Sequence, residues 1–185
     1  MKDLLQTPRA KGTLFVLILV LVLAGAVTWY VRSTHVRNEV GKPAAELLHE
    51  SETTPYQTLR GETFSFSAYR GKIRIVNVWA SWSPFSQTEL PILSEVAVAY
   101  KDRGVVALAI NRDEPIERAQ AYAATLPELP ELVYVIDETD AFYTSVGGYA
   151  MPETIIFDAA GDIVWHYRGV ITKELLIDQL EQLVP

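Results

Sequence analysis

One stretch constrains the fold of this chain more than any other, the segment from Ile75 to Pro91, which reads IVNVWASWSPFSQTELP. Its first part, up to Trp79, is a near-continuous apolar and β-prone run, as expected for a strand covered on both faces. A helix is predicted to begin at Ser83-Pro84, because serine is a favoured N-cap and proline a favoured first helical residue. Chemistry is often located where a strand runs into a helix, since free N–H groups and the helix dipole face the turn.

The chain on either side of this stretch continues the alternation of strands and helices. A hairpin is predicted over Tyr56–Ser67, and the helix from Ser83 is expected to end at Arg103-Gly104. Further strands are predicted at 105–110, 133–136, 154–157 and 163–167, and further helices at 114–126, at 140–146 and from Thr172 onward. This order predicts an α/β fold, a mixed central sheet with helices on both faces, over residues 56–185.

The first 55 residues have a different composition. Residues 12–31 carry no charged side chain, and roughly 20 apolar residues suffice to cross a bilayer as a helix. We predict a short N-terminus at 1–11, an uncleaved transmembrane anchor at 12–31 and a polar tether at 32–55. The competing interpretation is a cleaved signal peptide, because Ala24-Gly25-Ala26 resembles a small-residue cleavage site.

Charges that flank the apolar segment indicate its orientation. Lys2, Arg9 and Lys11 precede it and slightly outnumber Arg32 and Arg37, which follow it. The positive-inside rule therefore favours a single-pass membrane protein with a cytoplasmic N-terminus and an extracytoplasmic C-terminal domain. The formal net charge of -7 gives no reason to expect nucleic-acid binding.

Two segments carry a family resemblance. The first is Trp79–Ser86, WASWSPFS, followed by Glu89-Leu90-Pro91, and the second is Gly148–Thr154, GYAMPET. Together they resemble the TlpA/ResA-like branch of the thioredoxin superfamily, whose pattern is W-A-x-W-C-x-x-C and then E-L-P. The resemblance implies a thioredoxin-like fold with an N-terminal β-hairpin extension, one preceding transmembrane helix and a cis peptide bond before Pro152. It also implies that serines occupy both active-site cysteine positions.

The two serines are Ser83 and Ser86, and the chain contains no cysteine. A serine hydroxyl is not ionised near neutral pH and forms no disulfide, so dithiol exchange is impossible and no catalytic residue is assigned. A serine nucleophile would need a general base, but His35 and His49 lie in the tether and His166 is expected on a solvent-facing strand position. We therefore interpret Ser83 as an N-cap.

Other polar residues near the turn have ordinary interpretations. Asn77 is expected to be a hydrogen-bonded strand residue, and Glu89 a solvated or capping carboxylate rather than an acid-base group. Asp137, Glu138 and Asp140 lack the spacing of a calcium loop. We expect neither a metal site nor a cofactor.

The fold that the resemblance implies brings several apolar side chains around the turn. The expected binding groove comprises Trp82, Pro84, Phe85, Tyr149, Met151 and Pro152. An apolar surface beside strand-like backbone can hold an extended peptide by backbone pairing and side-chain pockets. The alternative is that these aromatic residues merely pack over the helix end. The predicted partner is thus a protein or an extended peptide, in addition to the membrane.

Three functions remain open. The chain is a membrane-tethered thioredoxin-like binding module that has lost redox chemistry, or a TlpA-like thiol-disulfide oxidoreductase whose cysteines were replaced by serine, or a purely structural domain of the cell envelope. The presence of Trp82, Phe85, Tyr149 and Pro152 favours the first two, because a purely structural domain would not need them.

Overall fold

The computed structural model describes residues 56–184, so the predicted N-terminus, anchor and tether lie outside the described residues. The strands are β1 (Tyr56–Thr58), β2 (Thr63–Phe64), β3 (Ile73–Trp79), β4 (Val105–Arg112), β5 (Leu132–Asp137), β6 (Glu153–Phe157) and β7 (Ile163–Arg168). The α-helices are α3 (Ser86–Tyr100), α4 (Ile116–Ala123), α5 (Ala141–Ser145) and α6 (Lys173–Leu180). Across residues 56–184, no helix combines the length and the apolar character needed to cross a membrane.

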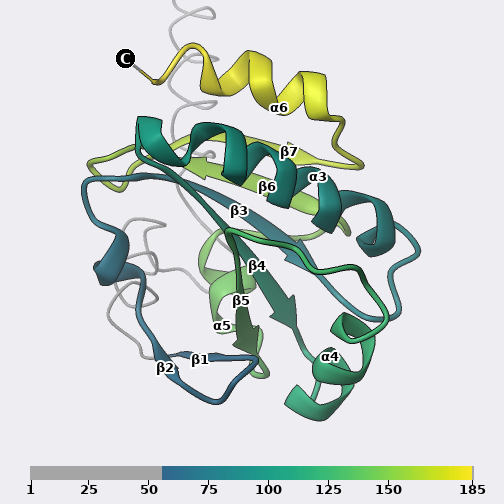
Figure 1. The fold of residues 1–185 in the computed structure, drawn as a ribbon. Helices are drawn as coiled ribbons and strands as arrows, with labels where there is room; N and C mark the ends of the chain where they lie inside the picture. The colour runs from purple at the N-terminus through teal and green to yellow at the C-terminus, as the bar shows by residue number, and fades with distance from the viewer. Residues whose placement is uncertain (1–55, 185) are drawn as a thin grey trace, which may run out of the picture. The chain divides into compact units, whose positions relative to one another are not determined.

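All seven strands form one mixed sheet in the order β2-β1-β5-β4-β3-β6-β7. β3 is parallel to β4 and antiparallel to β6, and every residue of β3 is buried. Figure 1 shows α3 and α6 over one face of this sheet and α5 on the other side. The predicted mixed sheet with helices on both faces is therefore confirmed.

The alternation of side chains along β3 divides the core into two layers. Ile75 and Trp79 pack in a cluster with residues of α3 and α6, whereas Val76 and Val78 pack in a second cluster with Phe142 of α5. Successive strand residues point to opposite faces, so a strand between two helical layers must be apolar on both. This explains the continuous apolar run that the sequence shows.

Several boundaries differ from the prediction. The hairpin is present, but Phe66 lies in a 3-10 helix, Phe66–Tyr69, that Ser65 caps, and not in the second strand. Helix α4 begins at Ile116 rather than Glu114, because Pro115 has extended backbone angles of φ -59° and ψ 143° and disfavours helical geometry in the residue before it. Helix α3 ends at Tyr100, earlier than predicted, and a 3-10 helix, Lys101–Arg103, continues the chain to Gly104, whose left-handed φ of 77° ends it as expected for a glycine stop.

Candidate functional site

The turn between β3 and α3 differs from the prediction at its serines. Helix α3 begins at Ser86, after an N-cap residue, Phe85, that makes no side-chain capping bond. Ser83 is therefore not the N-cap: it lies in a preceding turn, where its N–H donates to the Ala80 carbonyl at 3.1 Å. The carbonyl of Phe85 accepts from the N–H of Glu89 at 3.0 Å, which is the first bond of α3, so Ser83 and Pro84 lie before the helix.

Both serines are nearly inaccessible, since Ser83 is 4% exposed and Ser86 1% exposed. The Ser86 hydroxyl donates to the carbonyl oxygen of Ala80 at 2.9 Å. This hydrogen bond ties the first helical residue back to the end of β3. The aromatic side chains of the same turn are exposed instead, Trp82 by 59% and Phe85 by 40%, and Pro84 is exposed as well.

A second loop lies at the same edge of the sheet. We call residues 147–152 the cis-proline loop, because the Met151–Pro152 peptide bond is cis, which confirms the prediction for Pro152. Glu153, the first residue of β6, lies opposite Val78 of β3. The antiparallel register thus places the cis-proline loop beside the turn that follows β3. Tyr149 in this loop is 77% exposed, whereas Met151 is partly buried against the core.

Most backbone groups of the cis-proline loop are engaged. The N–H groups of Tyr149 and Ala150 donate to Glu153 Oε1 at 2.9 Å and 2.7 Å. The Tyr143 hydroxyl donates to the Ala150 carbonyl at 2.7 Å, and Gly169 N–H donates to the Pro152 carbonyl at 3.0 Å. Among residues 56–184, the N–H and C=O of Met151 have no hydrogen-bond partner.

Glu153 is fully buried and carries a compensated charge. Its Oε2 lies 2.7 Å from His166 Nε2, and Arg168 Nε lies 3.5 Å from its Oε1. Burial alone would raise the pKa of Glu153, but the hydrogen bonds from His166 and from the Tyr149 and Ala150 amides outweigh it and lower the pKa. The expectation of a solvent-facing His166 is wrong, because its ring turns toward this carboxylate and is mostly buried.

Glu114 holds the β3–α3 turn in a similar way. Its carboxylate accepts hydrogen bonds from Ser81 N–H at 2.7 Å, from the Ser81 hydroxyl at 2.5 Å and from Asn111 Nδ2 at 2.8 Å. The sequence analysis missed this residue. The available signal was a carboxylate that directly precedes Pro115, because the residue before a proline is disfavoured in helical geometry and Glu114 is therefore a loop residue rather than the first residue of the helix.

Glu89 is buried, at 1% exposure, so the expectation of a solvated carboxylate is wrong. Its Oε1 accepts from the N–H of Ile171 in the β7–α6 loop at 2.8 Å, and its Oε2 accepts from Asn77 Nδ2 at 3.3 Å. Asn77 also donates to Thr154 Oγ1 at 3.0 Å, which confirms it as a hydrogen-bonded strand residue. Burial raises the pKa of Glu89, although the bonds from Ile171 and Asn77 partly oppose the shift.

Three buried carboxylates therefore fix three loops around the Ser83–Ser86 segment. Glu114 binds the β3–α3 turn, Glu153 binds the cis-proline loop and Glu89 binds the β7–α6 loop. Each accepts at least one backbone N–H group. Carboxylates that accept several hydrogen bonds order the backbone around them, since an unsatisfied buried charge is costly. The three loops therefore form one preordered surface rather than three independent segments.

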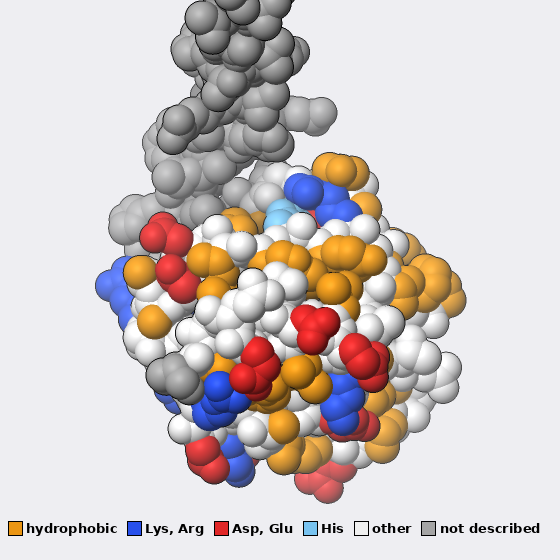
Figure 2. Space-filling view, turned by 90° about the horizontal axis from the view of Figure 1, so that it is seen from above, with side chains coloured by type: hydrophobic (Ala, Val, Ile, Leu, Met, Phe, Trp, Pro, Cys, Tyr) orange, Lys and Arg blue, Asp and Glu red, His pale blue; other side chains and the backbone are white. Residues whose placement is uncertain are grey.

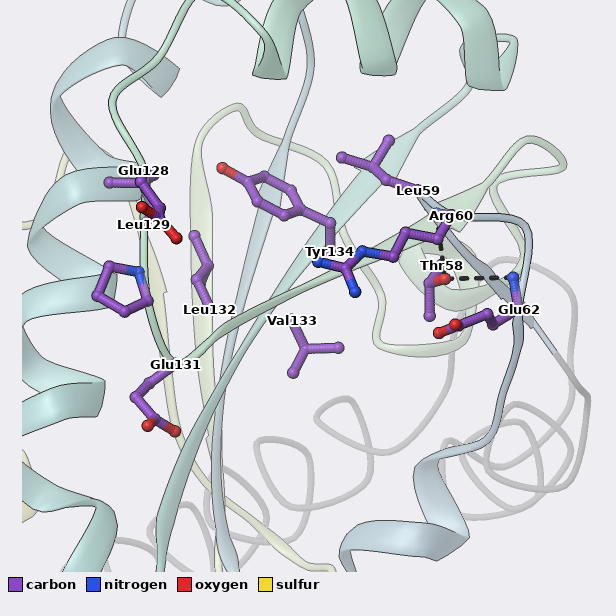
Figure 3. A pocket seen from close by; sticks show the side chains of 11 residues that line it. Thr58, Leu59, Arg60, Glu62, Glu128, Leu129, Glu131, Leu132, Val133 and Tyr134 are labelled. Carbon is purple, nitrogen blue, oxygen red and sulfur yellow. Dashed lines mark hydrogen bonds between the residues drawn. The ribbon is translucent and has the colours of Figure 1, made fainter.

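The rest of the surface offers less. On the face shown in Figure 2, hydrophobic side chains lie among acidic and basic groups, and no single sign of charge dominates. A cavity of about 420 Å³ between the β1–β2 hairpin and the start of β5 is lined by Arg60, Leu132 and Tyr134 among others (Figure 3), none of which belongs to the predicted groove. Within residues 56–184, no cluster of His, Asp or Glu side chains is suited to a metal ion.

Comparisons with known proteins place this geometry in a family. A model of the Redoxin family matches residues 40–183. The chain is 31% identical to thiol-disulfide oxidoreductase ResA of Geobacillus kaustophilus over 131 residues, which cover 69% of this chain and 72% of that protein. It is 33% identical to thiol:disulfide interchange protein DsbE of Pseudomonas fluorescens over 124 residues, 66% of this chain and 67% of that one.

Solved structures show the same fold. A putative thiol:disulfide interchange protein DsbE from Chlorobium tepidum superposes with a TM-score of 0.65 at 22% identity, covering 70% of this chain and 92% of that chain. A secreted Mycobacterium tuberculosis disulfide oxidoreductase gives a TM-score of 0.63 at 20% identity and covers 72% of this chain and 98% of its own. The fold is thus thioredoxin-like, and by sequence the chain belongs to the Redoxin family, among relatives of the ResA and DsbE thiol-disulfide oxidoreductases.

Proposed function

We propose that this chain is a membrane-tethered, thioredoxin-like binding protein that holds an extended peptide at the cis-proline loop and performs no dithiol exchange. In this proposal Ser83 and Ser86 stand where the ResA-like and DsbE-like relatives carry their reactive thiols. The protein descends from thiol-disulfide oxidoreductases, and it has kept their peptide-binding surface while losing the redox activity.

The observation that carries the proposal is the unpaired backbone of Met151. Its neighbours direct their polar groups inward, to Glu153, Tyr143 and Gly169, while its own N–H and C=O remain without partners among residues 56–184. A backbone N–H and C=O of one residue, both open, are what one residue of an added strand needs for pairing. A peptide backbone would satisfy both groups.

Exposed aromatic side chains provide the second contribution. Trp82 and Phe85 follow β3, and Tyr149 precedes Met151 in the adjacent loop. Large aromatic side chains contribute strongly to binding because they cover much apolar area with few rotatable bonds. The proposed site therefore pairs with the peptide backbone through Met151 and contacts the peptide side chains through these rings.

The proposed location follows from the N-terminal sequence. Residues 12–31 would anchor the protein, residues 32–55 would tether it, and the thioredoxin-like domain would face the extracytoplasmic side. Partners would then be envelope proteins or their unfolded segments. An enzyme-like activity is absent from this proposal, because the chain supplies no thiol.

The test uses the full chain in detergent micelles and a phage-displayed library of cysteine-free ten-residue peptides. A selected peptide is titrated by fluorescence anisotropy against the wild type, Trp82→Ala and Tyr149→Ala. We expect each variant to weaken binding about tenfold or more, which corresponds to roughly 1.4 kcal/mol for loss of an aromatic anchor. Val98→Ala removes another exposed apolar side chain, on α3 and outside the predicted groove, and serves as the control.

If all four proteins bind the selected peptide with equal affinity, the predicted groove is not the binding site. Failure to select any peptide, with the protein folded, would favour the purely structural alternative.

A further inference from the structure

Glu153 has an unusual place in this site: it is a fully buried carboxylate that directly follows the cis-proline, and the contacts it makes go to the cis-proline loop or to β7. We propose that Glu153 is the positioning residue of the peptide site, which fixes the cis-proline loop so that the N–H of Met151, and not the N–H groups of Tyr149 and Ala150, is offered to a ligand. This inference rests on the proposed function, because it specifies how that same site is shaped.

The first step in the argument is the pair of bonds on one oxygen. Glu153 Oε1 accepts both the Tyr149 and the Ala150 N–H, at 2.9 Å and 2.7 Å. Two successive N–H groups that converge on one acceptor fix the peptide plane between them. Without that acceptor, both donors would be open to peptide carbonyls, and the loop would offer several competing registers instead of one.

The second step concerns the negative charge of Glu153, which is buried and therefore cannot be stabilised by water. His166 lies 2.7 Å from Oε2 and Arg168 Nε lies 3.5 Å from Oε1. Both come from β7, the edge strand that pairs with β6. The carboxylate thus has partners on each oxygen, so it can remain buried and act as an acceptor.

The third step links the same cluster to the exposed ring. The Arg168 guanidinium lies over the Tyr149 ring, 4.5 Å from its centroid, and its NH2 group donates to the Gly147 carbonyl at 3.3 Å. One face of the Tyr149 ring therefore packs against a cation, while the residue remains 77% exposed. Glu153 and Arg168 together hold the cis-proline loop at Gly147, Tyr149 and Ala150.

The charge and the shape of Glu153 can be separated by substitution. Glu153→Ala removes the acceptor for Tyr149 and Ala150 altogether. Glu153→Gln keeps one carbonyl oxygen that can accept both N–H groups, and its amide nitrogen can donate to His166 when the imidazole nitrogen is unprotonated. A positioning role predicts that Gln rescues binding, whereas a role that needs the negative charge itself predicts no rescue.

The experiment combines peptide affinity with amide hydrogen exchange, both on the full chain in detergent micelles. In the free wild type we expect the Tyr149 and Ala150 amides to exchange at least tenfold more slowly than the neighbouring Met151 amide. We expect Glu153→Ala to abolish this difference and to weaken the selected peptide about tenfold or more, and Glu153→Gln to restore both within about threefold.

The outcomes separate this inference from the proposed function. Equal exchange of the three amides in the wild type overturns the positioning role, even if Glu153→Ala fails to fold. Undiminished peptide affinity in a folded Glu153→Ala variant, or no recovery in Glu153→Gln, also overturns it. If no peptide is selected but the Tyr149 and Ala150 amides are protected from exchange, the proposed function fails, whereas the role of Glu153 in fixing the cis-proline loop is supported.

Discussion

Asn77 on β3 donates a hydrogen bond from Nδ2 to the buried carboxylate of Glu89 on α3, at 3.3 Å. The amide oxygen of Asn77 has no partner, although it is buried. The pair joins the central strand to the first turn of the helix that follows it. It also leaves one unpaired acceptor beside a carboxyl group whose pKa burial has raised.

Glu89→Gln should change how stability depends on pH. Because the folded pKa of Glu89 lies above its unfolded value of about 4.3, the native state holds this proton longer than the unfolded state. The stability contributed by Glu89 is therefore complete below about pH 4 and falls as pH rises to the folded pKa. The glutamine variant lacks this loss, and its amide can donate to Asn77 Oδ1 once the Asn77 side chain flips.

Urea unfolding of the full chain in micelles between pH 4 and pH 8 checks this prediction. The free energy of unfolding of Glu89→Gln, relative to the wild type, should increase with pH by about 1.4 kcal/mol for each unit of pKa shift. Glu174→Gln, which removes an exposed carboxylate in the first turn of α6, is the matched control. A difference between Glu89→Gln and wild type that stays constant with pH would contradict the predicted linkage.

Glu114→Ala should destabilise the protein by about 3 kcal/mol, because it leaves several donors without an acceptor and each buried unpaired donor costs roughly 1–3 kcal/mol. These donors are the N–H and hydroxyl of Ser81 and the amide of Asn111. Glu114→Gln keeps one accepting oxygen and should lose less. Chemical denaturation gives the values, and the exposed Glu117→Ala should stay within about 0.5 kcal/mol of wild type. Comparable losses for Glu114→Ala and Glu117→Ala would show that the turn does not depend on Glu114.

Gly148→Ala should lower the stability of the protein more than Gly147→Ala does. A Cβ at Gly148 would lie 2.3 Å from Cε2 of Tyr143, whose hydroxyl supports the cis-proline loop at Ala150. The ring is also held by the Arg112 guanidinium, 3.7 Å from its centroid, so it cannot move freely. Overpacking of this kind costs about 1–3 kcal/mol, and displacement of the Tyr143 hydroxyl adds the loss of one hydrogen bond.

The neighbouring glycine provides the comparison. Gly147 has φ 67° and open space around a built Cβ, so alanine there meets only the backbone cost of the left-handed region, about 1–2 kcal/mol. Thermal unfolding of both variants measures the difference. If Gly148→Ala is the milder of the two, the contact with Tyr143 is not tight in solution.

Installing two thiols tests the ancestry of the site. In Ser83→Cys/Ser86→Cys, one thiol would lie in the turn that precedes α3 and the other on the first residue of α3, where the helix dipole lowers a thiol pKa. We expect a reversible disulfide and, with dithiothreitol as the reductant that regenerates the dithiol, reduction of insulin disulfides at a rate well above that of wild type, which has no thiol. Ser83→Cys alone lacks a resolving thiol and should show no turnover. A double variant that forms no disulfide would show that this turn does not hold the two positions in a geometry that a disulfide can close.

Local sequence patterns alone were sufficient for much of the architecture. The apolar run of β3, the stop at Gly104 and the cap at Thr172, whose side chain accepts from Leu175 N–H at 3.2 Å, all depend on residues close together in the chain. The cis bond at Pro152 was predicted from the resemblance of its surrounding motif. The strand, the stop and the cap need no knowledge of distant partners, so periodicity and capping are enough to predict them, whereas the cis bond was implied only by the family resemblance.

The burial and partners of the polar residues were decided only by the tertiary structure. Glu89 was expected in solvent, but its partner Ile171 lies 82 residues further along the chain, and Glu114 binds Ser81 across 33 residues. His166 turns inward because the pairing of β7 with β6 brings it to Glu153. The sequence pattern around a glutamate does not distinguish a solvated carboxylate from one that accepts hydrogen bonds from a loop. The difference depends on segments that come together only when the sheet forms. The sequence by itself thus determined the order and type of the elements, and the tertiary structure decided which charges are buried and which backbone groups they hold.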